Sequence, residues 1–131
     1  MKTVKAYTDI PQSKRLAEIL PLESADMWYS YYGNSKYNPI IAYKGEQLFL
    51  CQIRNSLHSD IPCWSLAALL DILSKTAHSI DEDGSVDLSS YKNIEWNCRL
   101  INIADLEVST SLNPVDACYK MIININELNL L

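Results

Sequence analysis

The stretch HSDIPCWSLAALLDILSKTAHS, residues 58–79, contains the clearest helical pattern in the chain. Four of its leucines recur at a spacing that places them on one face of a helix. They are Leu66, Leu69, Leu70 and Leu73. Ser59 or Asp60 supplies a start signal, and Pro62 then falls in the first turn, where a proline is tolerated. We therefore expect an amphipathic helix that begins before Pro62 and packs against a sheet.

Two further helices are predicted, one near each end of the chain. In the first, Asp9 is a candidate N-cap and Pro11 falls in the opening turn, while the apolar residues of SKRLAEIL lie on one stripe. Pro21 ends this helix because its ring clashes with the preceding turn. In the second, Asn113 is the candidate N-cap, Pro114 occupies the first helical position, and the helix continues towards the C-terminus.

Aromatic and β-branched runs predict strands in the rest of the chain. Three of them form an antiparallel meander: MWYSYY (27–32), NPIIAY (38–43) and QLFLCQI (47–53). A fourth strand is predicted in IEWNCRLINI (94–103), where apolar and polar residues alternate, with a weaker fifth at Leu106–Val108. We expect the polar stretch Ser79–Ser90 to be a linker with a turn at Asp83 and Gly84.

Together these elements predict an α+β fold, with an antiparallel sheet of four to five strands and three helices packed mainly on one face. The chain has 131 residues, 48% of them hydrophobic, so we expect a single domain over residues 1–131. No apolar run reaches the roughly 18 residues of a membrane span, and the N-terminus has no apolar signal-peptide core. These features predict a cytoplasmic protein without a membrane partner.

Cofactor and metal motifs are missing from the sequence. The glycines are isolated, so no phosphate-binding loop forms, and the cysteines and histidines lack the C-x2-C pairing of zinc sites. The acidic turn after residue 80 lacks the glycine and glutamate that a calcium loop needs at its sixth and twelfth positions. We therefore expect no cofactor. The four cysteines, Cys51, Cys63, Cys98 and Cys118, are interpreted as reduced core residues.

The net charge of -5 is concentrated in one segment. Residues 81–107 contain seven acidic side chains against two basic ones, and the rest of the chain is balanced. No basic stripe of the kind that neutralises phosphates is present, so nucleic-acid binding is disfavoured. An acidic face of this kind suits a basic site on another protein.

The most suggestive candidate site is aromatic. Six rings fall on two neighbouring predicted strands: Trp28, Tyr29, Tyr31, Tyr32, Tyr37 and Tyr43. Alternation along a strand cannot place them all on one face, so we expect some to remain exposed, where tyrosine and tryptophan often anchor protein interfaces. Ordinary stacking between strands is the competing interpretation.

Two other hypotheses belong to different classes of protein. One is a small enzyme with a site around His58 and Asp60, which requires an acid, a base or a nucleophile to converge there. The other is a structural homodimer formed through an exposed sheet face or an edge strand. The chain has only two histidines and no complete catalytic set, so the sequence favours binding over catalysis.

Three phrases resemble a family of small uncharacterised proteins encoded in phages, prophages and mobile elements of gut anaerobic bacteria. They are RLAEILPLESADM (15–27), IPCWSLAALLDIL (61–73) and NPVDACYKMIININELNLL (113–131). The family carries no assigned activity, so the resemblance implies a genomic setting and no functional residue. We expect a cytoplasmic accessory protein that binds a host protein or itself, through the aromatic strands or the acidic segment 81–107.

Overall fold

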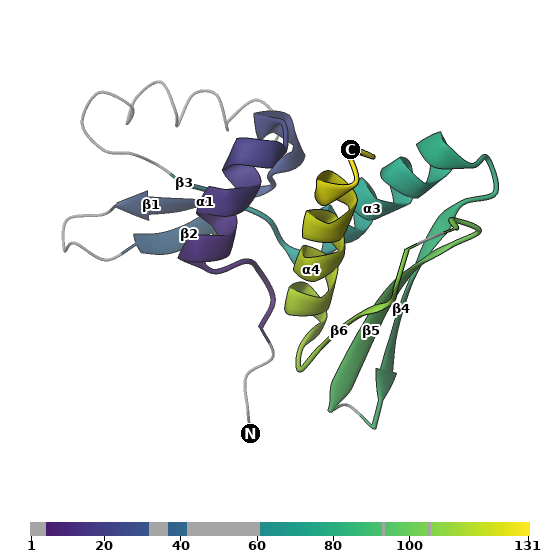
Figure 1. Cartoon of the computed structure of the whole chain (residues 1–131). Coiled ribbons are helices and arrows are strands. Elements are labelled where there is room, and N and C mark those ends of the chain that lie inside the picture. The colour runs from purple at the N-terminus through teal and green to yellow at the C-terminus, as the bar shows by residue number, and fades with distance from the viewer. Residues whose placement is uncertain (1–4, 32–36, 42–60, 93, 105) are drawn as a thin grey trace. The chain divides into compact units, whose positions relative to one another are not determined.

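The structure is a computed structural model that describes residues 5–31, 37–41, 61–92, 94–104 and 106–131 (Figure 1). In these residues it contains three α-helices and two antiparallel sheets of three strands each. The α+β class is therefore confirmed, and the prediction of one sheet of four to five strands is wrong. Contacts divide the chain into two compact units: residues 7–65, and residues 1–6 with 66–131. The single domain over residues 1–131 stays a prediction.

In the unit of residues 7–65, a central strand is paired on both sides. This unit contains α1 (Ile10–Ile19), the 3-10 helix η1 (Leu22–Ser24), β1 (Met27–Tyr31), β2 (Tyr37–Ile41) and β3 (Ile61–Cys63). The strand order is β2-β1-β3, so Trp28 of β1 lies opposite Ile40 on one side and Pro62 on the other. The third predicted strand, residues 47–53, lies outside the described residues.

Helix α1 begins and ends where the sequence predicts. The Asp9 carboxylate accepts a hydrogen bond from the Gln12 backbone N–H at 2.9 Å, and the Gln12 side chain accepts one from the Asp9 N–H at 3.1 Å. This reciprocal pair is a capping box, which satisfies two backbone donors that the first turn leaves free. The helix ends at Ile19, ahead of Pro21.

The predicted start of the long helix is wrong. Residues Ile61–Cys63 form strand β3 and pair with β1, and helix α3 (Leu66–Ile80) begins only at Leu66. All three β3 residues are buried, and a short buried strand has the same apolar pattern as a helical segment. Pro62 fits here because β3 is the outer strand among the described strands of this sheet, where a proline need not donate to a neighbour. Ser59 and Asp60 lie outside the described residues.

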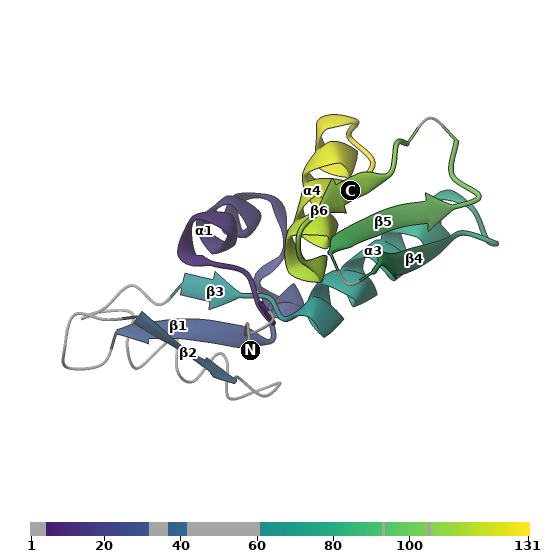
Figure 2. The same ribbon diagram turned by 90° about the horizontal axis from the view of Figure 1, so that it is seen from below.

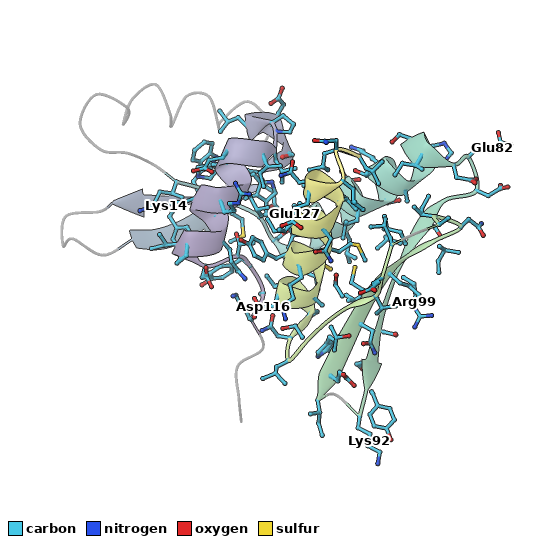
Figure 3. All side chains as sticks on the ribbon, viewed as in Figure 1. Lys14, Glu82, Lys92, Arg99, Asp116 and Glu127 are labelled. Atoms are coloured by element: carbon cyan, nitrogen blue, oxygen red, sulfur yellow. The ribbon has the colours of Figure 1, made fainter. Side chains whose placement is uncertain are left out.

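The second unit consists of α3 with β4 (Ser85–Tyr91), β5 (Glu95–Ile101), β6 (Ser109–Ser111) and α4 (Pro114–Glu127). Its sheet has the order β4-β5-β6, and α3 and α4 lie against one face (Figure 2). Along β5, Cys98 and Leu100 are buried on the helical side, whereas Arg99 and Ile101 are exposed on the other. Figure 3 shows the Arg99 side chain directed away from α4. This unit therefore has helices on one face of its sheet, as the sequence predicts for the whole fold.

Two sequence assignments in this unit are wrong. The predicted linker Ser79–Ser90 contains the end of α3 and most of β4, and the weak strand forms at Ser109–Ser111 instead of Leu106–Val108. β4 is a polar edge strand in which Val86 and Leu88 are only partly buried. Such a strand carries little apolar signal, because one edge and one face meet water. Its register with β5 is nevertheless continuous from Ser85 to Tyr91.

Helix α4 confirms the predicted N-cap. The Asn113 side chain accepts a hydrogen bond from the Asp116 backbone N–H at 2.8 Å, with Pro114 in the first turn. Asp116 also pairs with Lys5, whose Nζ lies 2.8 Å from its carboxylate. The side chains of Cys118, Met121 and other residues on one stripe are fully buried. Among the described residues, no helix is both long and apolar enough to be a membrane-spanning segment.

Gly84 is required by a close backbone approach at the end of α3. A Cβ added there would lie 2.2 Å from the Ala77 carbonyl oxygen and 2.7 Å from its carbon. That same oxygen accepts the Asp81 backbone N–H at 3.0 Å, so it cannot move aside without breaking the last hydrogen bond of the helix.

We expect Gly84→Ala to lower the free energy of unfolding by about 2 kcal/mol or more, the usual cost of inserting an atom into occupied space. Ser85→Ala, at the neighbouring exposed position, should change it by less than about 0.5 kcal/mol. Urea unfolding followed by circular dichroism measures both. Equal stability of the two variants would contradict the close approach.

Candidate functional site

The structure buries the two aromatic candidates whose side chains it describes. Trp28 is 2% exposed and Tyr29 is 6% exposed, although the two side chains point to opposite faces of β1. Neither ring lies on a surface that a partner can reach. The other four candidates, Tyr31, Tyr32, Tyr37 and Tyr43, have side chains outside the described residues, and so do His58 and Asp60. For these residues the interaction surface and the enzyme site stay predictions.

Tyr29 belongs to a polar network centred on buried Thr8. The Tyr29 hydroxyl donates to the Thr8 carbonyl oxygen at 2.7 Å, and the Trp64 backbone N–H donates to Thr8 Oγ1 at 3.2 Å. Ser13 Oγ lies 2.7 Å from the same Oγ1, which also lies 3.7 Å from the Cys63 thiol. Thr8 and Ser13 are fully buried. The network satisfies polar groups inside a core, as buried polar groups require.

The thiols of the described residues do not form a nucleophilic site. Burial raises the pKa of Cys63, which disfavours the thiolate form that a nucleophile needs. In the other unit, a hydrogen bond between the two thiols lowers the pKa of Cys98 and raises that of Cys118, and both side chains are fully buried. The structure confirms that Cys63, Cys98 and Cys118 are buried core residues, and their reduced state stays a prediction. Cys51 lies outside the described residues.

The acidic segment 81–107 is spread along strands and turns. Its charges on β4 and β5 lie at exposed positions, and Arg99 Nε approaches the Asp87 carboxylate at 3.8 Å on the face away from the helices. In the described part of the chain, no three acidic, histidine or cysteine side chains gather closely enough to hold a metal ion.

A hollow in the second unit lies where the β4–β5 turn faces β6 and the start of α4. It measures about 570 Å³ and is lined by seven residues: Tyr91, Ile94, Glu95, Thr110, Ser111, Leu112 and Lys120. We call it the terminal groove. This volume is within the range of about 300–1,000 Å³ that ligand pockets occupy.

Large apolar side chains reach solvent in the terminal groove. Tyr91 is 61% exposed, Ile94 is 65% exposed and Leu112 is 79% exposed. These are the three highest exposures among the large apolar side chains of the described residues, and all three line the same hollow. An isolated exposed leucine is ordinary, but a cluster of exposed apolar residues in a concave surface is typical of a binding site.

Leu112 is exposed at a position where an apolar residue usually packs. It directly precedes the N-cap Asn113, and a side chain there commonly contacts the fourth helical residue, here Ala117. Ala117 is fully buried, while Leu112 extends into solvent at the groove. Leu112 is therefore available to another molecule.

Local backbone geometry places the other groove residues. Tyr91 lies opposite Glu95 in the last pair of the β4–β5 ladder, and Asn97 lies opposite Thr110 in the next ladder. Because alternate residues of a strand share a face, Tyr91, Glu95 and Thr110 lie on the sheet face away from Cys98. Lys92 adopts φ 53° in the turn, and its ammonium lies 5.4 Å from the Tyr91 ring centroid at the end of the hairpin (Figure 3).

Two charged side chains of opposite sign line the terminal groove. Glu95 stands at the start of β5, and Lys120 lies on α4, where its Nζ donates to the Thr110 carbonyl oxygen at 3.0 Å. Both side chains are exposed. The groove could not be predicted from the sequence, because Tyr91 lies next to the predicted linker and Leu112 directly before a helix. The usable signal was an apolar residue directly before the N-cap.

No protein-family model, curated protein or solved structure matched this chain in a comparison with known proteins. The resemblance to proteins of phages and mobile elements therefore stays a prediction.

The Thr8 network predicts a difference between two substitutions of the same residue. Thr8→Val removes the hydroxyl and leaves the buried Trp64 N–H without its side-chain acceptor, so we expect a loss of about 1–3 kcal/mol in unfolding free energy. Thr8→Ser keeps the hydroxyl and removes one methyl group, for a loss of about 0.8 kcal/mol. Chemical unfolding of both variants measures the difference. If serine costs as much as valine, packing rather than hydrogen bonding stabilises the site.

Thiol reactivity tests the burial of Cys63, Cys98 and Cys118. We expect all three to resist alkylation by iodoacetamide in the folded protein even at about pH 8.5, where an ordinary thiol is half ionised. Peptide mass spectrometry should find them fully alkylated after unfolding in guanidinium chloride. Rapid labelling of the folded protein at any of the three would show that its position is open to solvent.

Proposed function

We propose that this chain is a small cytoplasmic accessory protein, of phage or mobile-element origin, that acts by binding a protein through the terminal groove. The observation that carries the proposal is the gathering of Tyr91, Ile94 and Leu112, which are the most exposed large apolar side chains of the described residues, in one hollow. Protein interfaces place aromatic and aliphatic anchors in such pockets.

Energetics support binding at this position. Full burial of an exposed leucine or isoleucine side chain contributes about 1.5–3 kcal/mol. The Tyr91 ring adds a hydroxyl that can hydrogen bond at the edge of an interface, and Lys92 already lies beside its face. Three such anchors are a typical number for the energetic centre of an interface.

The surroundings of the groove also suit protein contact. Its lining combines apolar side chains with the hydroxyls of Thr110 and Ser111 and the charges of Glu95 and Lys120. A polar rim around an apolar centre is the usual composition of a protein interface. Tyr91, Ile94 and Glu95 of the groove belong to the acidic segment 81–107. The predicted acidic surface and the groove therefore share the β4–β5 turn.

Site-specific photo-crosslinking tests this function. With benzoylphenylalanine in place of Leu112, we expect irradiation of cells producing the protein to yield a discrete covalent adduct of higher mass. The matched control carries the probe at Leu128, an exposed leucine that is 52% accessible and lies outside the groove. Gel mobility and mass spectrometry report the adducts. No adduct from position 112, or the same adducts from both positions, would contradict the proposal.

A further inference from the structure

We propose that the occupant of the terminal groove is a second copy of this chain, docked about a two-fold axis so that Glu95 of each copy meets Lys120 of the other. The inference rests on the proposed function, because it names the partner of the same groove. It depends on the placement of two opposite charges beside three exposed apolar side chains.

A two-fold interface requires a surface that complements itself. Each residue i of one copy meets residue j of the other, and j meets i in return. A patch of one sign of charge repels its own copy. The terminal groove instead has a carboxylate on β5 and an ammonium on α4, so a half-turn brings each charge to its opposite and forms two ion pairs at once.

Both charges are available for such pairs. Among the described residues, neither Glu95 nor Lys120 is in a salt bridge, although both are exposed. Lys120 Nζ uses one donor on the Thr110 carbonyl oxygen, and an ammonium has three. That hydrogen bond holds the ammonium at the groove and leaves two donors for a partner carboxylate.

Self-association also fits the charge of the whole chain. With a net charge of -5, two copies repel each other over most approaches. Among the side chains that line the terminal groove, Lys120 balances Glu95, so the lining carries no net charge, unlike the acidic segment 81–107 as a whole. Two copies therefore approach here with little repulsion, and the apolar side chains of Tyr91, Ile94 and Leu112 can meet their counterparts.

The usual size of an exposed apolar patch on a monomer predicts a weak dimer. An apolar patch on a monomer covers about 300–600 Å² at its largest, whereas a standard stable interface buries about 800 Å² per partner. We therefore expect dissociation in the micromolar range, with monomer and dimer both populated as concentration is varied.

Sedimentation velocity of the full chain over a concentration series tests the inference. The wild type should change from monomer to dimer with concentration, and Leu112→Glu should stay monomeric. Glu95→Lys and Lys120→Glu should each weaken the dimer by about tenfold or more, because like charges then face each other twice. Glu127→Lys and Lys75→Glu make the same charge changes at exposed positions outside the groove and should have little effect.

Charge exchange gives a result that misfolding cannot imitate. An equimolar mixture of the two single variants should form a heterodimer. The two lysines that E95K carries at the groove then face the two glutamates that K120E carries there. The double variant E95K/K120E should recover the wild-type dimer. Circular dichroism of each variant confirms that it is folded.

The two proposals fail in different ways. A wild type that remains monomeric over the whole series, or a dimer that the control substitutions weaken as much as the groove substitutions, overturns the second copy as occupant. If position 112 nevertheless crosslinks to a different protein, protein binding at the groove stands without self-association. A dimer that Leu112→Glu leaves unchanged overturns the groove as the interface.

Discussion

Thr8 is buried between segments that are far apart in the sequence, and it hydrogen bonds to several of them. Its carbonyl accepts the Tyr29 hydroxyl, its Oγ1 accepts the Trp64 N–H, and its own N–H donates to the Trp64 carbonyl at 3.0 Å. The chain before α1 is thus fixed to β1 and to the end of β3. Asp26 makes a second link between distant segments, because its carboxylate accepts hydrogen bonds from both the backbone N–H and the hydroxyl of Ser65. These hydrogen bonds stabilise the unit of residues 7–65. They also explain why the Tyr29 side chain is part of the core, since its hydroxyl donates to the Thr8 carbonyl oxygen.

The second unit is organised differently, and this difference is why the candidate site lies there. Its helices cover one face of a three-stranded sheet, and the core consists of apolar side chains and the two hydrogen-bonded thiols. At the end of the hairpin the sheet extends past the helices (Figure 1), and Tyr91 and Ile94 are exposed there. Ile94 lies at the end of the hairpin, and Leu112 lies directly before the N-cap of α4. Because β5 and β6 are adjacent, both residues line the same hollow.

Local rules predicted the helices well and the strands unevenly. The caps at Asp9 and Asn113 follow from side chains that bond their own backbone, so a short stretch of sequence contains the whole interaction. β3 could not be predicted in this way, because its three residues are strand only through pairing with β1 more than thirty residues earlier. β4 has too few apolar residues for its sequence to predict a strand. The burial of Trp28 and Tyr29 on opposite faces of β1 depends on tertiary packing that periodicity does not contain.

Lys120 has a consequence for aggregation as well as for recognition. β6 is an edge strand that pairs with β5 along one side, and an unpaired strand edge invites addition of a foreign strand. The Lys120 ammonium occupies the Thr110 carbonyl, which is an acceptor that an incoming strand would need. β6 has only three residues, and one of its carbonyl groups is already bonded. This edge therefore offers few free backbone groups to which further strands could add to form a fibril. The side chain that we propose pairs with a second copy therefore also hinders the addition of a strand at this edge.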